Sequence, residues 1–481
     1  MQRDRADSTD LSAPRKEAAP PPTPQTDSAP RLSHRTLLLA LFAAAAAIAA
    51  AILLPRLSLL RNSVVPFASS SSNTRLANFA NPANRSISSM ALPKSLKAKP
   101  APLSTAGVGP WTTQDPFLFC VFHHDAYPAG DESLRPAVAN YKRGRNMGSD
   151  FEGKDGWRMY HGDDVPGFPQ HPHRGFETIT ITKTGLIDHS DSLGAAARFG
   201  EGDTQWLTAG KGIVHCEMFP LVHKDKGNPT DFFQIWLNLP KSDKMVDPYF
   251  TMIWAEETPT LTVPAPPSNT PPSIVRVIAG ASLPVPGATT DGVVPSTPPP
   301  PNSYASKPWS NMAIWTVDMS PGGEVTIPAL ANPVANPQGH TDVTRVLYFF
   351  AGDRIALSDP DSDANAGPVT VLTSHASIAL HATEPTLVRN TGEKQGRLLM
   401  LQASPLGEPV AQHGPFVMNT RQEIFEAFMD YRETQFGGWR WPNDEPTHGG
   451  LEVGRFARHP GGEVTKKFEG KVRGEWGQGW V

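Results

Sequence analysis

Short runs of β-branched and aromatic residues recur through the second half of the chain. They are bounded by Gly, Asp or Pro, which favour turns, and such segments are typical of β-strands. The runs occupy residues 273–280, 312–319, 344–353, 369–373, 377–382, 385–390 and 397–403. The pattern therefore predicts an all-β architecture for this half of the chain.

Two strand-like segments of the first half carry pairs of polar side chains. His171 and His173 lie in PQHPHRGFETITI, and His215 and Glu217 lie in TAGKGIVHCEMF. Side chains at positions i and i+2 of a strand project to the same face, so the members of each pair point together. Two such strands facing each other across a small barrel would offer three imidazoles and one carboxylate to a single ion.

This donor set suits a divalent transition metal, because imidazole with carboxylate favours iron, nickel, copper or zinc over magnesium or calcium. Iron(II) is the expected ion, with nickel, copper, manganese and zinc as alternatives. Four protein ligands on an octahedral ion leave two positions open, whereas a structural zinc site is closed and usually richer in cysteine. Cys216 points away from its two neighbours and is expected to be a packed thiol.

Four residues beside the paired ligands have weaker signals. Gln205 and Trp206 precede the second pair, and either could orient a ligand or line a cavity. Core packing is favoured for Phe176 and Trp206, and a surface or turn position is expected for Glu177.

The second half contains no paired ligands. Its isolated histidines, His340, His375 and His381, are expected in loops or at the surface. Gly202-Asp203 and Gly352-Asp353 fall at similar places in the two halves, which hints at an internal duplication.

Length and charge narrow the functional classes. With 481 residues the chain has room for two domains of about 140 residues and for tails. A net charge of −4 and a pI near 6.4 give no reason to expect a nucleic-acid partner, which requires a concentrated basic surface. Two cysteines, Cys120 and Cys216, exclude a disulfide framework.

The N-terminal region differs from the rest in composition. The apolar run at residues 36–54 approaches the ~20 residues that a helix needs to cross a bilayer. From Ser28 through Gln114 there is no Asp or Glu, and such basic, Ser-rich composition is typical of transit segments. We expect either a membrane anchor through residues 36–54 with a flexible stalk, or a two-part presequence of the plastid type. Neither favours a nuclear location.

Proline clusters mark linkers and loops, because extended Pro-rich segments cannot form central strands. The predicted organisation is a polar Pro-rich tail (1–35), a hydrophobic transmembrane or signal segment (36–55), a basic Ser-rich, acid-free linker or transit segment (56–110), a first domain with the metal site (111–258), a Pro-rich linker (259–273), a second domain without a metal site (274–437) that a Pro-rich insertion interrupts at about 284–308, and a C-terminal tail without an assigned role (438–481).

The chain resembles the pirin family of bicupin proteins from residue 115 onward. The motifs that carry this resemblance are DPFLF (115–119), GFPQHPHRGFET (167–178), GDTQWLTAGKGIVHCEM (202–218), QIWLNLPKSDKMVDP (234–248), EPVAQHGPFVMNT (408–420) and EIFEAFMDYRETQF (423–436). The resemblance implies two tandem cupin barrels of the double-stranded β-helix or jelly-roll type. It also implies a short helix near the C-terminal end, after a disordered or targeting N-terminal region.

The resemblance further implies one metal site, in the first barrel, with His171, His173, His215 and Glu217 as ligands. The family usually has a small residue where this chain has Cys216, which leaves the ligands intact. Extra sequence around DESLRPAVANYKRGRNMGSDFEGKDGWRMYHG lies between DPFLF and GFPQHPH. This insertion is expected to reshape the approach to the metal.

Some pirin-like proteins cleave flavonols such as quercetin, so the first hypothesis is a mononuclear non-haem iron dioxygenase acting on a small aromatic enol. Glu217 is the candidate general base, because a carboxylate that loosens from a metal accepts a proton more readily than an imidazole that the metal holds neutral. Other pirin-like proteins bind transcription factors, so the alternative is a redox-responsive regulatory protein with a protein partner and no catalysis. A third hypothesis is a metal kept for stability alone. A monomer is expected.

Overall fold

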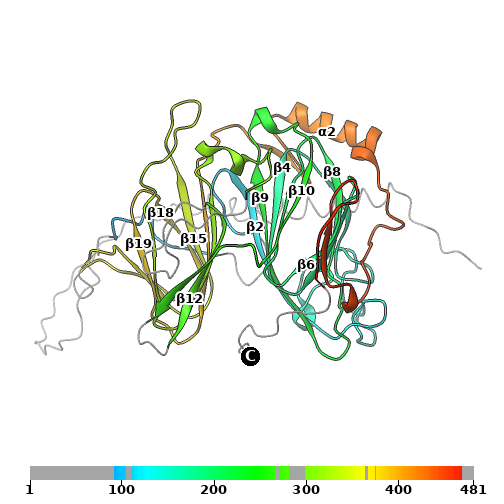
Figure 1. Cartoon of the computed structure of the whole chain (residues 1–481), viewed down its shortest axis with the longest axis horizontal. Coiled ribbons are helices and arrows are strands. Elements are labelled where there is room, and N and C mark those ends of the chain that lie inside the picture. The colour runs from blue at the N-terminus through cyan, green and yellow to red at the C-terminus, as the bar shows by residue number, and fades with distance from the viewer. Residues whose placement is uncertain are drawn as a thin grey trace, which may run out of the picture. The chain divides into compact units, whose positions relative to one another are not determined.

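Two neighbouring β-barrels contain most of the strands of this computed structural model (Figure 1). The structure describes residues 92–103, 110–265, 270–280, 298–362, 367–373 and 375–468, which lie in one compact unit, Asn73–Val481. One α-helix, α2 (Arg421–Thr434), occurs among the described residues. The predicted all-β architecture of two tandem barrels with a short helix near the C-terminal end is confirmed. Of the N-terminal region predicted to be disordered or targeting, the structure describes residues 92–103, and residues 1–91 lie outside the described residues.

The N-terminal barrel consists of two facing antiparallel sheets. The first has the order β10 (Tyr249–Ile253), β7 (Thr204–Thr208), β4 (Phe176–Thr184), β9 (Asn228–Asn238), β2 (Phe117–Tyr127). The second has the order β24 (Val464–Phe468), β23 (Arg455–Arg458), β6 (Ala196–Gly200), β5 (Leu186–Asp191), β8 (Ile213–Met218), β3 (Gly167–His173). The strands with the candidate ligands, β3 and β8, are therefore neighbours in the second sheet.

The C-terminal barrel repeats this arrangement. Its larger sheet has the order β1 (Ala101–Pro102), β18 (Ala376–His381), β15 (Thr344–Ala351), β20 (Gly396–Ala403), β13 (Ala313–Met319), β12 (Thr270–Ala279), β11 (Thr260–Ala265). Its smaller sheet has the order β14 (Glu324–Ile327), β19 (Thr386–Asn390), β16 (Ile355–Ser358), β17 (Thr370–Leu372). The order β14-β19-β16-β17 corresponds to β3-β8-β5-β6, and β18-β15-β20-β13 corresponds to β7-β4-β9-β2.

Short elements complete the described fold. A hairpin, β21 (Ala411–His413) and β22 (Phe416–Met418), precedes α2. The 3₁₀ helices are η2 (Lys154–Gly156), η3 (Lys241–Asp243), η4 (Tyr304–Ser306), η5 (Pro308–Ser310), η6 (Gln435–Gly437) and η7 (Leu451–Val453). Helix α2 begins at a capping box, in which Thr420 accepts from the Glu423 amide and Glu423 accepts from the Thr420 amide.

The two barrels share a hydrophobic core that strand alternation explains. Alternate residues of β4 and β9, such as Ile179 and Ile235, pack with Tyr348 and Leu399 of the C-terminal barrel. The residues between them point into the N-terminal barrel, because successive side chains of a strand lie on opposite faces. The shared core therefore determines which side chains line the barrel interior.

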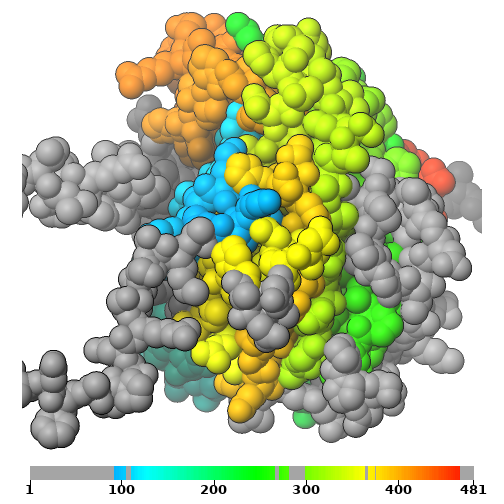
Figure 2. All heavy atoms as spheres, turned by 90° about the vertical axis from the view of Figure 1, so that its left-hand side faces the viewer, coloured from blue at the N-terminus to red at the C-terminus, as the bar shows by residue number. Residues whose placement is uncertain are grey.

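Each end of the described chain packs on the distant barrel. At the N-terminal end, β1 pairs with β18, and Leu96 lies in the core of the C-terminal barrel. Figure 2 shows this segment in blue against the yellow strands of that barrel. At the C-terminal end, β23 pairs with β6 and extends the sheet that contains β3 and β8. The barrels are thus joined by exchanged segments as well as by their core.

The prediction of a membrane anchor is corrected. Across the part of the chain that the structure describes, no helix is long and apolar enough to cross a membrane. The 14 residues of α2 span ~21 Å at 1.5 Å per residue, which is short of the ~30 Å hydrocarbon layer. Residues 36–54, on which the prediction rested, lie outside the described residues, and the membrane-anchored location is withdrawn.

Glu177 is fully buried at the junction of the barrels, so its predicted surface position is wrong. Its Oε1 accepts hydrogen bonds from Trp206 Nε1 at 3.1 Å and Thr208 Oγ1 at 2.8 Å. Its Oε2 accepts from Ser303 Oγ at 2.9 Å and the Tyr304 amide at 3.1 Å. The carboxylate therefore ties β4 and β7 to the segment between β12 and β13 of the C-terminal barrel.

Glu177→Gln should lower the free energy of unfolding by about 2 kcal/mol, because the new amide group faces either an indole N–H or a backbone N–H. Burial raises the pKa of Glu177 to about 7, so its stabilising contribution, complete below pH 4.5, is lost as the pH rises through 7. The difference between wild type and the variant should therefore shrink from pH 5 to pH 8. Urea unfolding at several pH values measures this, with Thr208→Val as a control that removes only one hydroxyl.

Candidate metal centre

Three of the predicted ligands converge inside the N-terminal barrel. In the antiparallel pair of β3 and β8, His171 lies opposite His215. His173 follows on the same face of β3, and one ligand atom from each of these imidazoles lies within 4.8 Å of the others. The i and i+2 spacing on β3 together with the β3–β8 register produces this cluster.

The nitrogens of the cluster are arranged as acceptors. His171 Nδ1 lies 2.8 Å from the Pro169 carbonyl, which fixes the proton on that nitrogen and leaves Nε2 with a free lone pair. His171 Nε2 and His215 Nε2 are 3.0 Å apart. The Nδ1 atoms of His173 and His215 have no hydrogen-bond partner among the described residues. Such buried, unpaired nitrogens are unusual unless they meet a ligand or water.

Burial keeps the three imidazoles neutral. Desolvation lowers the pKa of His171 to about 4, and it lowers the pKa of His173 and of His215 well below the usual value. The neighbouring histidines lower the last two further. Neutral imidazole is the form that coordinates a metal, so protons compete weakly for these sites.

Glu217 lies two residues after His215 on β8, and two side chains that point into the barrel hold its carboxylate. Its Oε2 accepts from Gln234 Nε2 at 3.2 Å, and its Oε1 lies 3.1 Å from the Thr180 hydroxyl. Thr180 and Gln234 are opposite each other on β4 and β9. Burial raises the pKa of Glu217, while His189, Thr180 and Gln234 act in the opposite direction. The group of ligand atoms that lie within 4.8 Å of one another contains the three histidines and not Glu217. The structure therefore brings together three of the four predicted ligands, and the Glu217 carboxylate is held instead by Thr180 and Gln234.

Sequence reasoning missed a fourth buried histidine. His189 on β5 lies opposite Glu217, and its ring centroid is 5.5 Å from that of His215. Gln205 Nε2 donates to His189 Nδ1 at 2.9 Å, and His189 Nε2 lies 3.1 Å from Asp191 Oδ2. Both ring nitrogens are engaged, so His189 orients neighbours rather than offering a lone pair. The i and i+2 spacing of His189 and Asp191, both on β5, could have identified this histidine from the sequence.

Aromatic rings surround the open side of the cluster. His171 is half-buried, whereas His173 and His215 are buried. The Phe168 ring lies 6.4 Å from His171, and the Trp236 ring lies 5.4 Å from His173. An aromatic wall of this kind suits a flat, apolar ligand.

The insertion contributes one buried tyrosine below this wall. Tyr160 donates to Asp125 Oδ2 at 2.7 Å, and its oxygen lies 2.7 Å from His123 Nδ1. Its ring packs 5.1 Å from Phe168. Burial, together with nearby Arg158, lowers the pKa of His123 to about 3, so His123 is neutral and donates to Tyr160. The insertion therefore supports Phe168 from inside the barrel.

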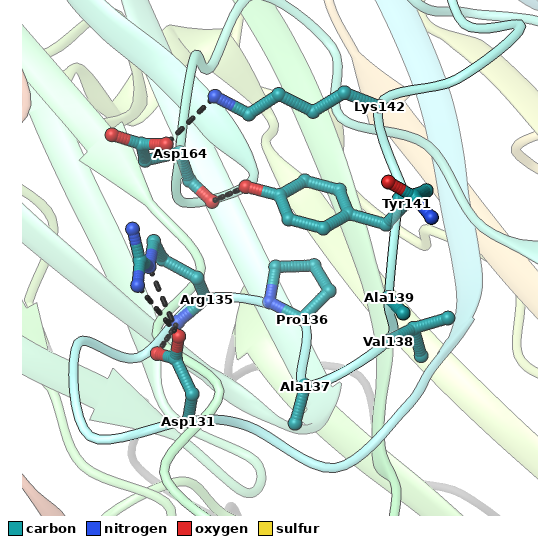
Figure 3. Close-up of a pocket in the computed structure, with 10 residues that line it drawn as sticks. Asp131, Arg135, Pro136, Ala137, Val138, Ala139, Tyr141, Lys142 and Asp164 are labelled. Atoms are coloured by element: carbon teal, nitrogen blue, oxygen red, sulfur yellow. Dashed lines mark hydrogen bonds and ion pairs between the residues drawn. The ribbon is translucent and has the colours of Figure 1, made fainter.

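A separate cavity of about 550 Å³ lies in the insertion itself (Figure 3). Lys142 Nζ lies 2.7 Å from Asp164 Oδ1, and Tyr141 donates to the Asp164 carbonyl at 3.2 Å. Arg135 pairs with Asp131. The candidate ligands do not line this cavity, and its charges are paired, so we assign it no chemistry.

The C-terminal strap, residues 438–468, backs the ligand-bearing sheet from outside. Asp444 binds Gln170, the residue before His171, through its carbonyl at 2.9 Å and its carboxylate at 3.2 Å. Arg198 makes a bidentate pair with Asp188, with both bonds at 2.7 Å, and its other donors bind the strap carbonyls of Gly449 and Gly450 at 2.6 Å. The tail to which sequence gave no role thus packs against β3, β5 and β6.

Comparisons with known proteins agree with this arrangement. The family models described as Pirin and as Pirin C-terminal cupin domain match residues 137–237 and 324–437. Human Pirin is 32% identical over 56% of this chain and 78% of its own length. A Pseudomonas aeruginosa protein, provisionally named quercetin 2,3-dioxygenase, is 31% identical over 56% of this chain and 79% of its own length.

Solved structures show a similar match. A quercetin 2,3-dioxygenase from Acinetobacter baumannii has a TM-score of 0.49 and 23% identity, and the match covers 72% of this chain and 99% of that one.

Asp188→Ala should lower the free energy of unfolding by about 3–5 kcal/mol, because it leaves the buried Arg198 guanidinium without its carboxylate. Thermal or urea unfolding measures the loss. Asp131→Ala is the matched control, since the Asp131–Arg135 pair is partly exposed, with side chains 31% and 42% accessible, and such pairs contribute about 0–1 kcal/mol. Equal losses in the two variants would contradict the stabilising role given to the buried Asp188–Arg198 pair.

Proposed function

Because this chain belongs to the pirin family, we propose that it is a mononuclear iron(II) protein that oxygenates a flavonol-like aromatic enol. The observation that carries the proposal is the convergence of three neutral imidazoles next to aromatic side chains, with Glu217 on the same strand as His215. The family relatives and the histidine cluster suggest a metal cofactor. Iron as the metal and a flavonol as the substrate are the proposed refinements.

The residues fit a divalent metal. Two nitrogens bound at right angles at ~2.1 Å from one ion lie ~3 Å apart, and the Nε2 atoms of His171 and His215 are separated by 3.0 Å. Nitrogen with carboxylate donors suits iron, nickel, copper, manganese or zinc. His171, His173, His215 and Glu217 would hold the ion, which supplies Lewis acidity and redox coupling to dioxygen when bound.

Glu217 is proposed as the general base. An aromatic enol placed at the cluster must lose its hydroxyl proton, and the Glu217 carboxylate accepts it. Burial raises the pKa of Glu217, which favours proton uptake. The Gln234 amide and the Thr180 hydroxyl hold the carboxylate in one orientation.

The aromatic wall would orient the substrate. The Trp236 ring packs 4.4 Å from Phe176 and 5.1 Å from Phe119, so its plane is held by neighbours. Phe168 occupies the other side of the cluster, near His171. A planar aromatic substrate between them would present its hydroxyl to the imidazoles and exclude water from the reacting atoms.

His171→Ala and His215→Ala should each lower the affinity for iron by at least ~10-fold, because each removes one of few protein ligands. Anaerobic reconstitution followed by elemental analysis measures iron per chain. His340→Ala is the matched control, since His340 is an exposed histidine of the C-terminal barrel outside the described cluster. Full iron content in both cluster variants would place the metal elsewhere.

Oxygen uptake with a panel of flavonols tests the activity. The iron-loaded protein should consume oxygen, and Glu217→Gln should lose at least ~100-fold of the uptake per bound iron, the usual contribution of a positioned base. Normalising to bound iron separates loss of the base from loss of the metal. Iron bound without uptake on any flavonol would instead support a redox-responsive binding protein.

A further inference from the structure

The C-terminal barrel lacks the histidine cluster but keeps its strand arrangement. Strand β14 pairs with β19 as β3 pairs with β8. Three inward residues of these strands, Val325, Ile327 and Val388, are apolar and belong to the barrel core. Across the residues that the structure describes, the cluster of the N-terminal barrel has no counterpart here.

A buried arginine lies inside this apolar barrel, near one end of β15. Arg345 shares the inward face of β15 with Leu347 and Phe349, and it is 1% exposed. Its Nε donates to Gln402 Oε1 at 2.6 Å, and its Nη1 donates to the Pro328 carbonyl at 2.9 Å. Both acceptors are neutral.

No negative charge balances this guanidinium among the described residues, and its Nη2 has no hydrogen-bond partner there. Burial lowers the pKa of Arg345 to about 10, so it remains a cation at neutral pH. A buried charge without a counter-charge is costly, and the cost falls when an anion hydrogen-bonds to it.

Two more buried groups without partners in the described part of the chain point into the same barrel, one from each of its sheets. Trp315 Nε1 on β13 and Thr386 Oγ1 on β19 are buried without partners among the described residues. Thr386 lies opposite Ile327, the residue before Pro328, so it is close to the arginine along the strand pair. Trp315 lies one inward position deeper than the Arg345–Gln402 pair. Arg345 Nη2 and Trp315 Nε1 only donate, and the Thr386 hydroxyl donates or accepts, so one acceptor chemistry satisfies all three.

A cavity shares Gln402 with this group, whereas Arg345, Trp315 and Thr386 are not among the residues that line it. It has a volume of about 300 Å³, and Gln402, Asn311, Met312 and Leu330 are among its lining residues. Gln402 therefore forms part of the cavity wall and also accepts from Arg345 Nε. Its amide is held in turn by donation to the Asn311 carbonyl at 2.9 Å.

We propose that this end of the C-terminal barrel binds a small oxyanion, such as a carboxylate or inorganic phosphate, through Arg345 Nη2 and the neighbouring N–H and O–H donors. An oxyanion presents only acceptors, which matches the unpaired donors, and bonds to a guanidinium are among the strong charge-assisted hydrogen bonds. The proposal does not depend on iron or on oxygenase activity, because it concerns the other barrel.

Thermal unfolding of the full-length protein tests the site. Inorganic phosphate and, separately, acetate and succinate are titrated at constant ionic strength with chloride as the reference anion. At least one of these oxyanions should raise Tm saturably by a few degrees, because a ligand that binds only the folded state stabilises it. Comparison of the shift in Tm between phosphate and the two carboxylates shows which kind of oxyanion the site binds. The shift should be equal in iron-loaded and metal-stripped protein, which separates it from binding at the histidine cluster.

Gln402→Glu supplies an internal counter-charge beside Arg345, so it should raise the starting Tm and abolish the anion-dependent shift. Arg345→Met should also abolish the shift, and Gln402→Glu decides the question if that variant does not fold. Arg389→Met is the matched control, since Arg389 pairs with Glu324 at 2.7 Å on the barrel exterior and should keep the full shift. No shift beyond chloride in wild type, or a shift retained in Gln402→Glu, would overturn the proposal.

Discussion

The shared core between the barrels is the constraint on which the rest of the structure depends. Strands β4 and β9 are buried on both faces, one against the C-terminal barrel and the other inside their own barrel. Because the shared face takes Ile179 and Ile235, the alternation turns Thr180 and Gln234 inward. Polar side chains buried inside a barrel need hydrogen-bond partners, and Thr180 and Gln234 have Glu217 as theirs. The orientation of the candidate base thus follows from packing on the far side of the same strands.

The opposite sheet of the N-terminal barrel is held from outside. Strand β6 would be an edge, with unpaired backbone groups open to other chains, but β23 covers it and β24 extends beyond. The same strap binds Gln170, next to His171, and closes the polar environment of Arg198. A sheet fixed on its edge and its outer face keeps the imidazoles at constant separation, which a metal ligand set requires.

Much of this arrangement could be predicted from the sequence, because it follows from local periodicity. The i and i+2 spacing placed His171 and His173 on one face, and they do come together with His215; their role as ligands stays a prediction. Glu177 was misplaced because its four donors come from β7 and from a loop more than one hundred residues away, and sequence does not reveal such partners.

The Gly-Asp pairs are not equivalent, since Gly202-Asp203 lies between β6 and β7 and Gly352-Asp353 lies between β15 and β16. The matching strand order of the two barrels supports an internal duplication, but the Gly-Asp pairs do not mark equivalent positions in it. The membrane prediction rested on residues 36–54 alone, without any described element to support it.

The two barrels have similar strand orders but contain different buried polar groups. In the N-terminal barrel, burial leaves three imidazoles neutral, and their lone pairs are available to a metal ion or a hydrogen-bond donor. In the C-terminal barrel, the corresponding strands contribute mainly aliphatic side chains to the core, and the buried Arg345 is a cation whose Nη2 has no partner among the described residues. A guanidinium keeps its charge on burial far more strongly than an imidazole does, because its ordinary pKa lies well above neutral pH. The first interior is therefore matched to a positive ion and the second to a negative one. A duplicated fold could acquire two complementary ligand preferences in this way, without a change in its strand order.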